Sequence, residues 1–165
     1  PRDAGMILVA QPIMMTIFSP LAGSLSDKIQ SRYIATLGMS MCTLGLFSFA
    51  FLTATTPIWL IVISLLFLGL GFALFSSPNM NTIMSSVNKT QYGLASGSAA
   101  TMRVVGQITS MTIATLFIAG FIGNQSVEVV SNAVFMKVIQ WGFLSFAGLS
   151  IFGIYFSFSR GVLNV

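Results

Sequence analysis

Five apolar segments, each long enough to cross a lipid bilayer, constrain the fold of this chain more than any other feature. They cover about residues 5–25, 33–52, 57–87, 94–121 and 134–158. A helix needs ~20 residues to cross ~30 Å of hydrocarbon at ~1.5 Å per residue. Backbone polar groups in lipid must be paired within the segment, and these segments lack the alternation of membrane strands. The sequence therefore predicts an all-α integral membrane protein with five transmembrane helices.

Composition agrees with a membrane setting and excludes several classes of function. Hydrophobic residues make up 55% of the chain and charged residues 6%, with a mean hydropathy of +0.93. The seven basic residues never form a run, which argues against nucleic-acid binding. Histidine is absent, and no cluster of Cys, Asp or Glu suits a metal or haem. With no base for a serine nucleophile and no P-loop, we expect neither an enzyme nor a bound cofactor.

The basic residues at the ends of the apolar segments predict an orientation. Four fall on one side of the membrane and two on the other: Lys28, Arg32, Lys89 and Arg160 against Arg2 and Lys137. Short cytoplasmic loops are enriched in Lys and Arg, so the side with four is predicted to be cytoplasmic. The carboxyl end is then inside the cell. Because the chain opens with Pro1 rather than Met, we expect it to be part of a longer protein.

The loop between the first two segments is unusually specific for a turn. Residues 23–32 hold three of the ten charged residues of the chain. A turn between helices needs only polarity, whereas this one places Asp27 four residues after Gly23 and follows it with Lys28 and Arg32. Such spacing indicates a function for the loop beyond joining two helices.

Segment 57–87 is longer than one perpendicular span and contains Pro78. Tilt, a kink at the proline or extension beyond the lipid could each absorb the excess length. One helical stripe joins its polar, small and aromatic residues: Ser64, Leu68, Gly71, Phe72, Phe75, Ser76 and Asn79. This stripe predicts either a wall of a substrate cavity, with Phe72, Phe75, Ser76 and Asn79 as candidates, or a plain helix–helix seam. In the first segment, Gln11 and the flexible Met15 are further cavity candidates.

Segment 94–121 carries a close-packing pattern and a charge. Gly93 and Gly97 have GxxxG spacing, which lets another helix approach closely. Arg103 lies ~13 Å along the helix from Leu94, at a depth where a charge needs a partner, a cavity or water. Its counter-charge could be Asp27 or an acid outside this chain, or the side chain could reach the headgroups. Gly106 and Gln107 extend its face, so Gly93, Gly97, Arg103 and Gly106 are predicted at a helix interface and Gln107 at the cavity.

Two of these patterns resemble a known family. The loop, with Gly23, Asp27, Lys28 and Arg32, resembles the cytoplasmic loop signature of the major facilitator superfamily, although Gln30 and Ser31 replace a glycine and a base of the common pattern. The second pattern is similar to the late spans of fourteen-span drug:proton antiporters, and consists of residues 69–78, residues 93–97, Arg103 and Gly106.

The resemblance implies a fold and an activity. The five segments would be the last five spans of a transporter, forming an incomplete carboxyl-terminal six-helix bundle without the amino-terminal half. The complete protein would export small amphipathic organic compounds from the plasma membrane by alternating access, coupled to protons. Asp27 would act as a conformational latch. Because these segments hold no Asp, Glu or His at mid-depth, the proton-coupling carboxylate would belong to the missing half.

Two other classes of function remain open at this point. A membrane assembly subunit that does not transport would use the same apolar helices without a cavity. An oligomeric pore would place Asn79, Gln107 and Arg103 around a channel. The lone Cys42 fits the role of a small packing residue in all three cases.

Overall fold

The computed structural model describes residues 2–53, 55–122 and 132–159, with side chains for residues 5–53, 55–121 and 134–159. This part of the chain is helical throughout apart from short turns, and it contains no strand. In order, the elements are α1 (Arg2–Leu8), α2 (Ala10–Ser26), α3 (Ser31–Ala50), α4 (Ile58–Ser85), the 3₁₀ turn η1 (Lys89–Gln91), α5 (Tyr92–Ile122) and α6 (Asn132–Phe158). Five spans are long and apolar enough to cross a membrane. The prediction of an all-α membrane protein is confirmed.

The first span is formed by α1 and α2 together. Val9 separates the two helices, but its N–H donates to the Gly5 carbonyl at 3.3 Å and its carbonyl accepts from the Ile13 N–H at 3.1 Å. Hydrogen bonding therefore continues through the break, and residues 5–26 form one apolar span. The proline at position 20 lies inside α2 without ending it.

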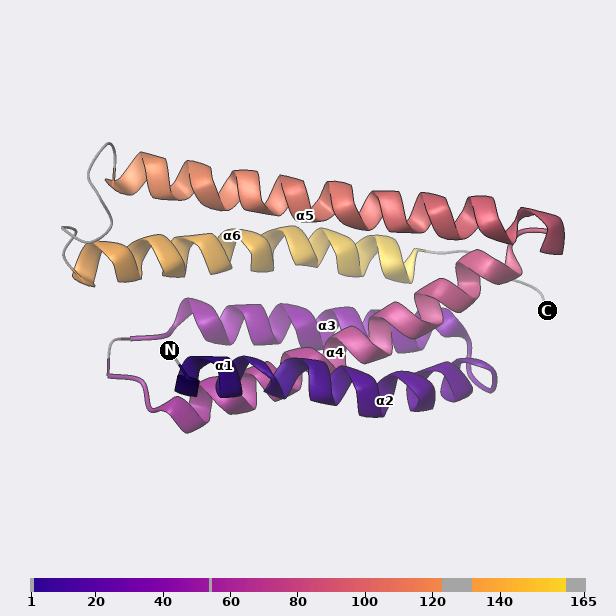
Figure 1. The fold of residues 1–165 in the computed structure, drawn as a ribbon, viewed down its shortest axis with the longest axis horizontal. Coiled ribbons are helices and arrows are strands. Elements are labelled where there is room, and N and C mark those ends of the chain that lie inside the picture. The colour runs from indigo at the N-terminus through magenta and orange to yellow at the C-terminus, as the bar shows by residue number, and fades with distance from the viewer. Residues whose placement is uncertain (1, 54, 123–131, 160–165) are drawn as a thin grey trace.

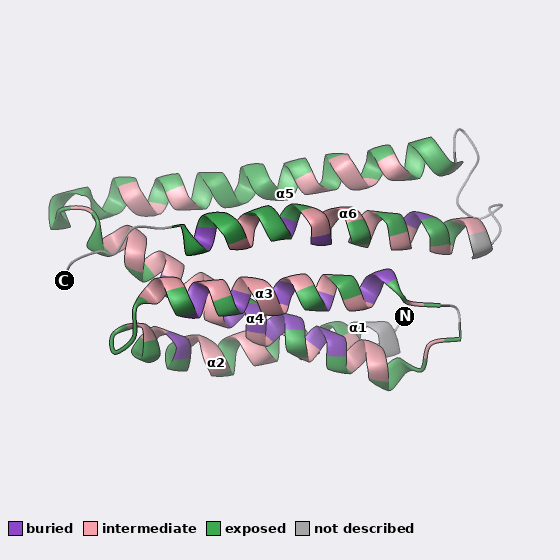
Figure 2. Cartoon of the chain, turned by 180° about the vertical axis from the view of Figure 1, so that it is seen from behind, coloured by how far each residue is buried: buried purple, intermediate pink, exposed green. Residues whose placement is uncertain are grey.

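Helix α4 packs between α2 and α3, and α3 packs on its other side against α6 (Figure 1). Helix α5 lies at the edge and contacts only α6, η1 and α4 among the described elements. Buried residues gather on α3 and α4, whereas no described residue of α5 is buried (Figure 2). The packed core is therefore the group α2, α3, α4 and α6, and α5 is an outlying helix.

Glycines set the closest approaches between these helices. A Cβ built on Gly38 of α3 would lie 2.6 Å from the Phe75 backbone nitrogen and 2.7 Å from the Gly71 carbonyl oxygen. A Cβ on Gly69 would lie 2.5 Å from the Gln11 carbonyl oxygen on α2. Because Gly69 and Gly71 are two residues apart, they face different partners, and α4 meets α2 and α3 at nearly the same height.

Hydroxyl pairs connect α3 to both of its neighbours. Ser48 and the buried Ser64 of α4 share a hydrogen bond of 3.1 Å. On the α6 side, Thr43 pairs with Ser150 at 2.7 Å, and Thr36 donates to Ser157 at 3.2 Å. The two α6 pairs are seven residues apart on each helix, which is two turns, so they form successive rungs between antiparallel helices. In lipid such pairs satisfy hydroxyls that have no access to water.

The long helix α4 is inclined to its neighbours. It has 28 residues, or ~42 Å at ~1.5 Å per residue, and it runs obliquely to its neighbours in Figure 1. Pro78 is fully buried inside it, and the helix continues past the proline to Ser85. The Thr82 hydroxyl donates to the Pro78 carbonyl at 2.9 Å, adding a side-chain bond in the turn after the proline. Tilt, a kink and extension beyond the lipid all remain predictions for the excess length.

We predict that Gly38→Ala destabilises the protein, because the new methyl group would push α3 away from the α4 backbone. The expected loss is about 1–3 kcal/mol, typical of overpacking, and thermal unfolding in detergent measures it. Gly120→Ala is the matched control, since no atom lies within 4 Å of a Cβ at that position. Equal melting temperatures for the two variants would contradict the proposed crossing contact.

Candidate functional site

Gly23 of the predicted latch loop is a packing residue. It lies in the last turns of α2, where an added Cβ would lie 3.0 Å from the Ser77 hydroxyl oxygen on α4. A larger residue at this position would force α2 away from α4. The glycine four residues before Asp27 therefore has a physical role, because it lets the end of α2 lie against α4 just before the loop.

A hydrogen bond fixes the same end of α2 to α4. The Asn81 amide donates from Nδ2 to the Ser26 hydroxyl at 2.9 Å, and Ser26 donates in turn to the Gly23 carbonyl at 2.7 Å. Ser77 and Asn81 are one helical turn apart on α4. The start of the loop is thus attached at two successive turns, by contacts that the sequence pattern did not identify.

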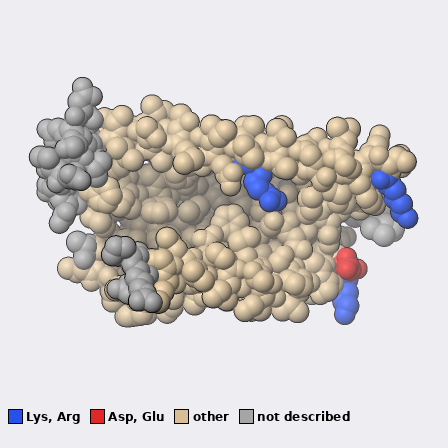
Figure 3. Space-filling view, in the orientation of Figure 1, with Lys and Arg blue, Asp and Glu red and all other residues tan. Residues whose placement is uncertain are grey.

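Asp27 and Lys28 lie at the surface where α2 ends. Both are exposed, and neither forms an ion pair within the described part of the chain. The backbone turns here because the N–H groups of Lys28 and Ile29 both donate to the Leu25 carbonyl, at 3.1 and 2.9 Å. Charged side chains appear together at this end of the molecule in Figure 3. The Asp27 carboxylate is held at a defined place while its own oxygens remain available.

Arg32 lies apart from the rest of the predicted latch. Its guanidinium carbon is 4.6 Å from the centre of the Tyr33 ring and 5.9 Å from that of Phe158, at the end of α6. One terminal nitrogen donates to the Tyr33 hydroxyl at 2.7 Å, while the Nε atom is buried without a hydrogen-bond partner. The side chain joins the beginning of α3 to the end of α6 by cation–π contacts. It forms no ion pair with Asp27.

The stripe predicted on α4 divides into two parts. Ser64, Leu68 and Gly71 are buried, and Ser64 bonds to α3 while Leu68 and Gly71 lie against its residues Gly45, Gly38 and Cys42. This half is the helix–helix seam. The remaining candidates are more open.

Among those remaining candidates, Phe72 is 41% exposed, and Phe75, Ser76 and Asn79 are half-buried. On α2, Gln11 and Met15 are also half-buried, and the backbone of Gln11 forms the closest contact with Gly69. These residues stay candidates for a cavity wall, with Gln11 also at a packing contact.

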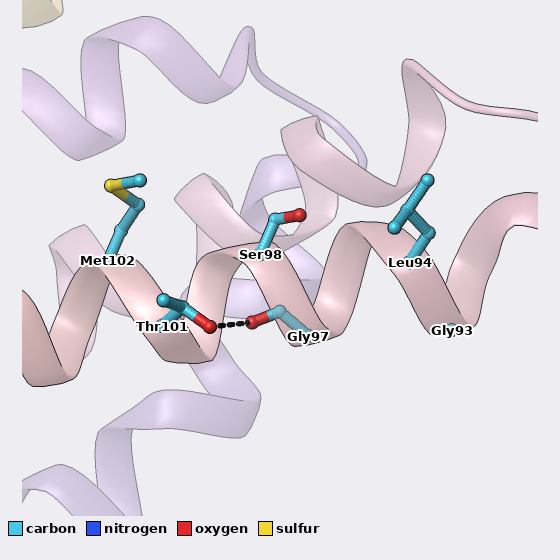
Figure 4. A pocket seen from close by; sticks show the side chains of 6 residues that line it. All are labelled: Gly93, Leu94, Gly97, Ser98, Thr101 and Met102. Carbon is cyan, nitrogen blue, oxygen red and sulfur yellow. Dashed lines mark hydrogen bonds between the residues drawn. The ribbon is translucent and has the colours of Figure 1, made fainter.

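The four interface residues predicted on α5 lie on two different faces. Gly93 and Gly97 line a shallow groove of about 360 Å³ together with Leu94, Ser98, Thr101 and Met102, all from α5 (Figure 4). The Thr101 hydroxyl donates to the Gly97 carbonyl at 2.9 Å within it. Arg103 and Gly106 are directed more than a quarter turn away, as the ~100° per residue of an α-helix requires. No atom lies within 4 Å of a Cβ built on Gly93, Gly97 or Gly106.

Arg103 and Gln107 are both exposed, and Arg103 has no hydrogen bond or ion pair within the described part of the chain. The alternative that Asp27 neutralises Arg103 is therefore not realised here. Among the described residues no group of His, Cys, Asp or Glu could hold a metal ion. The arrangement consists of helix–helix packing contacts, the exposed carboxylate of Asp27 at the end of α2, and the guanidinium of Arg103, which has no partner among the described residues. These groups suit ligand binding and conformational change rather than the making and breaking of covalent bonds.

Comparison with known proteins decides the family. Residues 1–162 match the Major Facilitator Superfamily. The chain belongs to this superfamily of membrane transporters. Its five apolar spans make it a multi-pass membrane protein, and membership of a transporter superfamily argues at the family level against the assembly subunit, the pore and an enzyme.

Several curated relatives are similar over most of the chain. The riboflavin transporter RibZ of Clostridioides difficile (strain 630) is 35% identical over 121 residues, covering 73% of this chain and 26% of RibZ. A tetracycline resistance determinant of Streptomyces rimosus is 32% identical, covering 68% of this chain and 33% of that protein. The multidrug resistance protein Stp of Mycobacterium tuberculosis (strain CDC 1551 / Oshkosh) is 27% identical, covering 68% of this chain and 21% of Stp. The chain thus spans between a fifth and a third of the length of these relatives. No solved structure matches.

We predict that Arg32→Gln lowers stability, because it removes the cation–π contacts with Tyr33 and Phe158. The expected loss is about 1–2 kcal/mol, seen as a drop of the melting temperature by a few degrees. Lys28→Gln is the matched control, since Lys28 is exposed and makes no such contact. An equal melting temperature for both variants would show that Arg32 does not hold α3 to α6.

Proposed function

We propose that this chain is the carboxyl-terminal part of a transporter that exports small amphipathic organic compounds by alternating access, with proton influx as the driving force. The observation that carries the transport function is the superfamily match across all five spans. Export is favoured by relatives whose names refer to tetracycline and multidrug resistance. The uncharged polar and aromatic side chains left open on α4 suit amphipathic compounds better than metal ions or small inorganic anions.

The remainder of the protein is the proposed partner of α5. Gly93 and Gly97 form an open groove on this helix, and the matching relatives are roughly two to three times as long as this chain. A groove floored by glycines lets a second helix come within backbone contact. We assign this place to a helix of the amino-terminal half, so that α5 lies at the boundary between the halves, with the lipid bilayer around both.

Asp27 is the proposed latch between the halves. Its carboxylate is exposed, while the helix end that carries it is attached to α4 by the Gly23–Ser77 contact and the Ser26–Asn81 hydrogen bond. A carboxylate in this place can accept hydrogen bonds from the amino terminus of a helix in the other half, where the helix dipole favours negative charge. Forming that contact in one state and losing it in the other shifts the equilibrium between them.

The proposed coupling to protons and the proposed orientation in the membrane both rest on where the acidic and basic residues lie. The described spans contain no Asp, Glu or His at mid-depth, so the acid that carries the proton is assigned to the amino-terminal half. The excess of basic residues beside Asp27 supports a cytoplasmic position for this loop. The carboxyl end is then cytoplasmic, although Arg160, which contributes to this orientation, lies outside the described residues. The proposed location is the plasma membrane.

Dye efflux from cells expressing the complete protein tests the proposal. We expect preloaded amphipathic dyes to leave these cells several times faster than control cells, with the difference abolished by a proton uncoupler. Asp27→Asn should slow efflux by roughly tenfold or more at unchanged expression, as expected when a charge-assisted contact of ~1.5–3 kcal/mol is lost.

Ser24→Ala is the control for the latch. Ser24 is exposed near the same helix end, and its hydroxyl bonds only to the Leu21 carbonyl of α2. We expect this variant to transport as the wild type does. Unchanged efflux in Asp27→Asn would reject the latch, whereas no dye efflux by the wild-type protein would reject drug export itself.

A further inference from the structure

The middle of α5 stands clear of the helices beside it. All residues from Ala100 to Thr109 are exposed, and partly buried residues occur only before and after them. The two partly buried groups are Ala95, Ser96 and Ala99, then Ser110, Ile113, Ala114 and Phe117. Helix α5 is therefore in contact near its beginning and in its second half, with an open stretch of ten residues between.

Arg103 lies on the inward face of this open stretch. Steps of four, three and four residues lead from Ala99 through Arg103 and Gly106 to Ser110, which places these residues on one side of the helix. Ala99 and Ser110 are partly buried, so this side is the one directed toward the other helices. Figure 3 shows the surface hollowed between the α5–α6 layer and the layer of α2 and α4.

The depth of Arg103 keeps its charge inside the membrane. Helix α5 has 31 residues, and its central residue is Gln107. Arg103 is four residues from that centre, or ~6 Å at ~1.5 Å per residue. With α5 centred in the bilayer, ~9 Å remain to the edge of a hydrocarbon core of ~30 Å. This is longer than an extended arginine side chain, so in a centred α5 the guanidinium would not reach the headgroups by snorkelling.

The charge of Arg103 has no acidic partner among the residues that the structure describes. The three acidic residues are Asp3, Asp27 and Glu128, so none lies on α3, α4 or α5. On the visible face, the hollow shows a basic side chain and no acidic one (Figure 3). Next to Arg103, the exposed Gln107 amide adds hydrogen-bonding groups, and Gly106 leaves room because no atom lies within 4 Å of a Cβ there.

We propose that Arg103 and Gln107 form a subsite for the anionic group of an organic substrate, such as a carboxylate. A planar guanidinium can bind a carboxylate through two parallel hydrogen bonds, and such contacts are strengthened away from water. This half of the protein then favours anionic or zwitterionic amphiphiles and disfavours lipophilic cations, which Arg103 would repel. The inference rests on the proposed transport function and names the substrate class of that cavity.

Two xanthene dyes of similar shape and opposite charge test the subsite. Fluorescein is anionic and rhodamine 123 is cationic. Their binding to the purified complete protein, and their accumulation in everted vesicles that contain it, are measured for the wild type, Arg103→Gln, Arg103→Lys and Lys137→Gln. Lys137→Gln is the matched control, because it removes an exposed basic charge near the start of α6, away from the open stretch.

The wild type is expected to bind and accumulate fluorescein in preference to rhodamine 123. Arg103→Gln should weaken fluorescein binding by roughly tenfold or more, the effect of losing ~1.4 kcal/mol or more of charge-assisted contact. Rhodamine 123 binding should stay equal or become tighter. Arg103→Lys should keep much of the preference for the anionic dye. Lys137→Gln should leave the binding of both dyes unchanged.

Three outcomes would overturn the subsite. The first is a wild type that binds only rhodamine 123. The second is an Arg103→Gln variant that binds both dyes more weakly by the same factor, and the third is an Arg103→Gln variant whose binding of both dyes is unchanged. Equal weakening would show that Arg103 pairs with an acid of the other half and supports the fold. A wild type that neither accumulates nor binds any dye would instead reject the transport function on which the subsite rests.

Discussion

Contact between the backbones of α3 and α4 at Gly38 and Gly71 is the interaction on which the rest of the packing depends. Lipid tails are as apolar as leucine side chains, so burial alone does not hold transmembrane helices together. Close approach and hydrogen bonds must do so. The absence of side chains at Gly38 and Gly71 allows the close approach. The pair Ser48 and Ser64 provides a hydrogen bond, two turns from Gly71 along α4. Helix α4 can then meet α2 at Gly69 on its other side.

This packing relates the fold to the proposed movement. Because α2 and α4 are joined at Gly69, at Gly23 and at the Ser26–Asn81 hydrogen bond, the loop with Asp27 is attached to the helix that offers the candidate cavity residues. In the proposed cycle, a change of contact at Asp27 would move α4 together with α2, because these contacts join the two helices. Helix α5 differs, since it is unburied and open on two faces. We assign its groove to a helix of the other half and its inward face to the substrate.

Hydropathy and signature spacing were sufficient to predict the helices, the membrane setting and the superfamily. They were not sufficient to show which face of each helix packs against a neighbour and which stays open. Polar and small residues on α4 suit a seam and a cavity equally well, and only the position of α3 shows that Ser64 and Leu68 belong to the seam. From the sequence, Arg32 is predicted to be a basic residue of the loop. The structure shows its guanidinium beside the ring of Phe158, which is distant in sequence. The seven-residue spacing of Thr36 and Thr43, matched by Ser150 and Ser157, is a signal that could have predicted the α3–α6 contact.

The central claim is that α2 and α4 move as one body throughout the transport cycle. In a Cys42→Ser background, Ser26→Cys and Asn81→Cys can be joined by a short bis-methanethiosulfonate, which forms a disulfide with each thiol; the side-chain atoms now at these positions are 2.9 Å apart. Dye transport by the complete protein is then measured before cross-linking, after it, and after reduction. Transport that persists in the cross-linked protein is the predicted result. Transport that stops on cross-linking and returns on reduction would show that the two helices must separate, and would contradict the account.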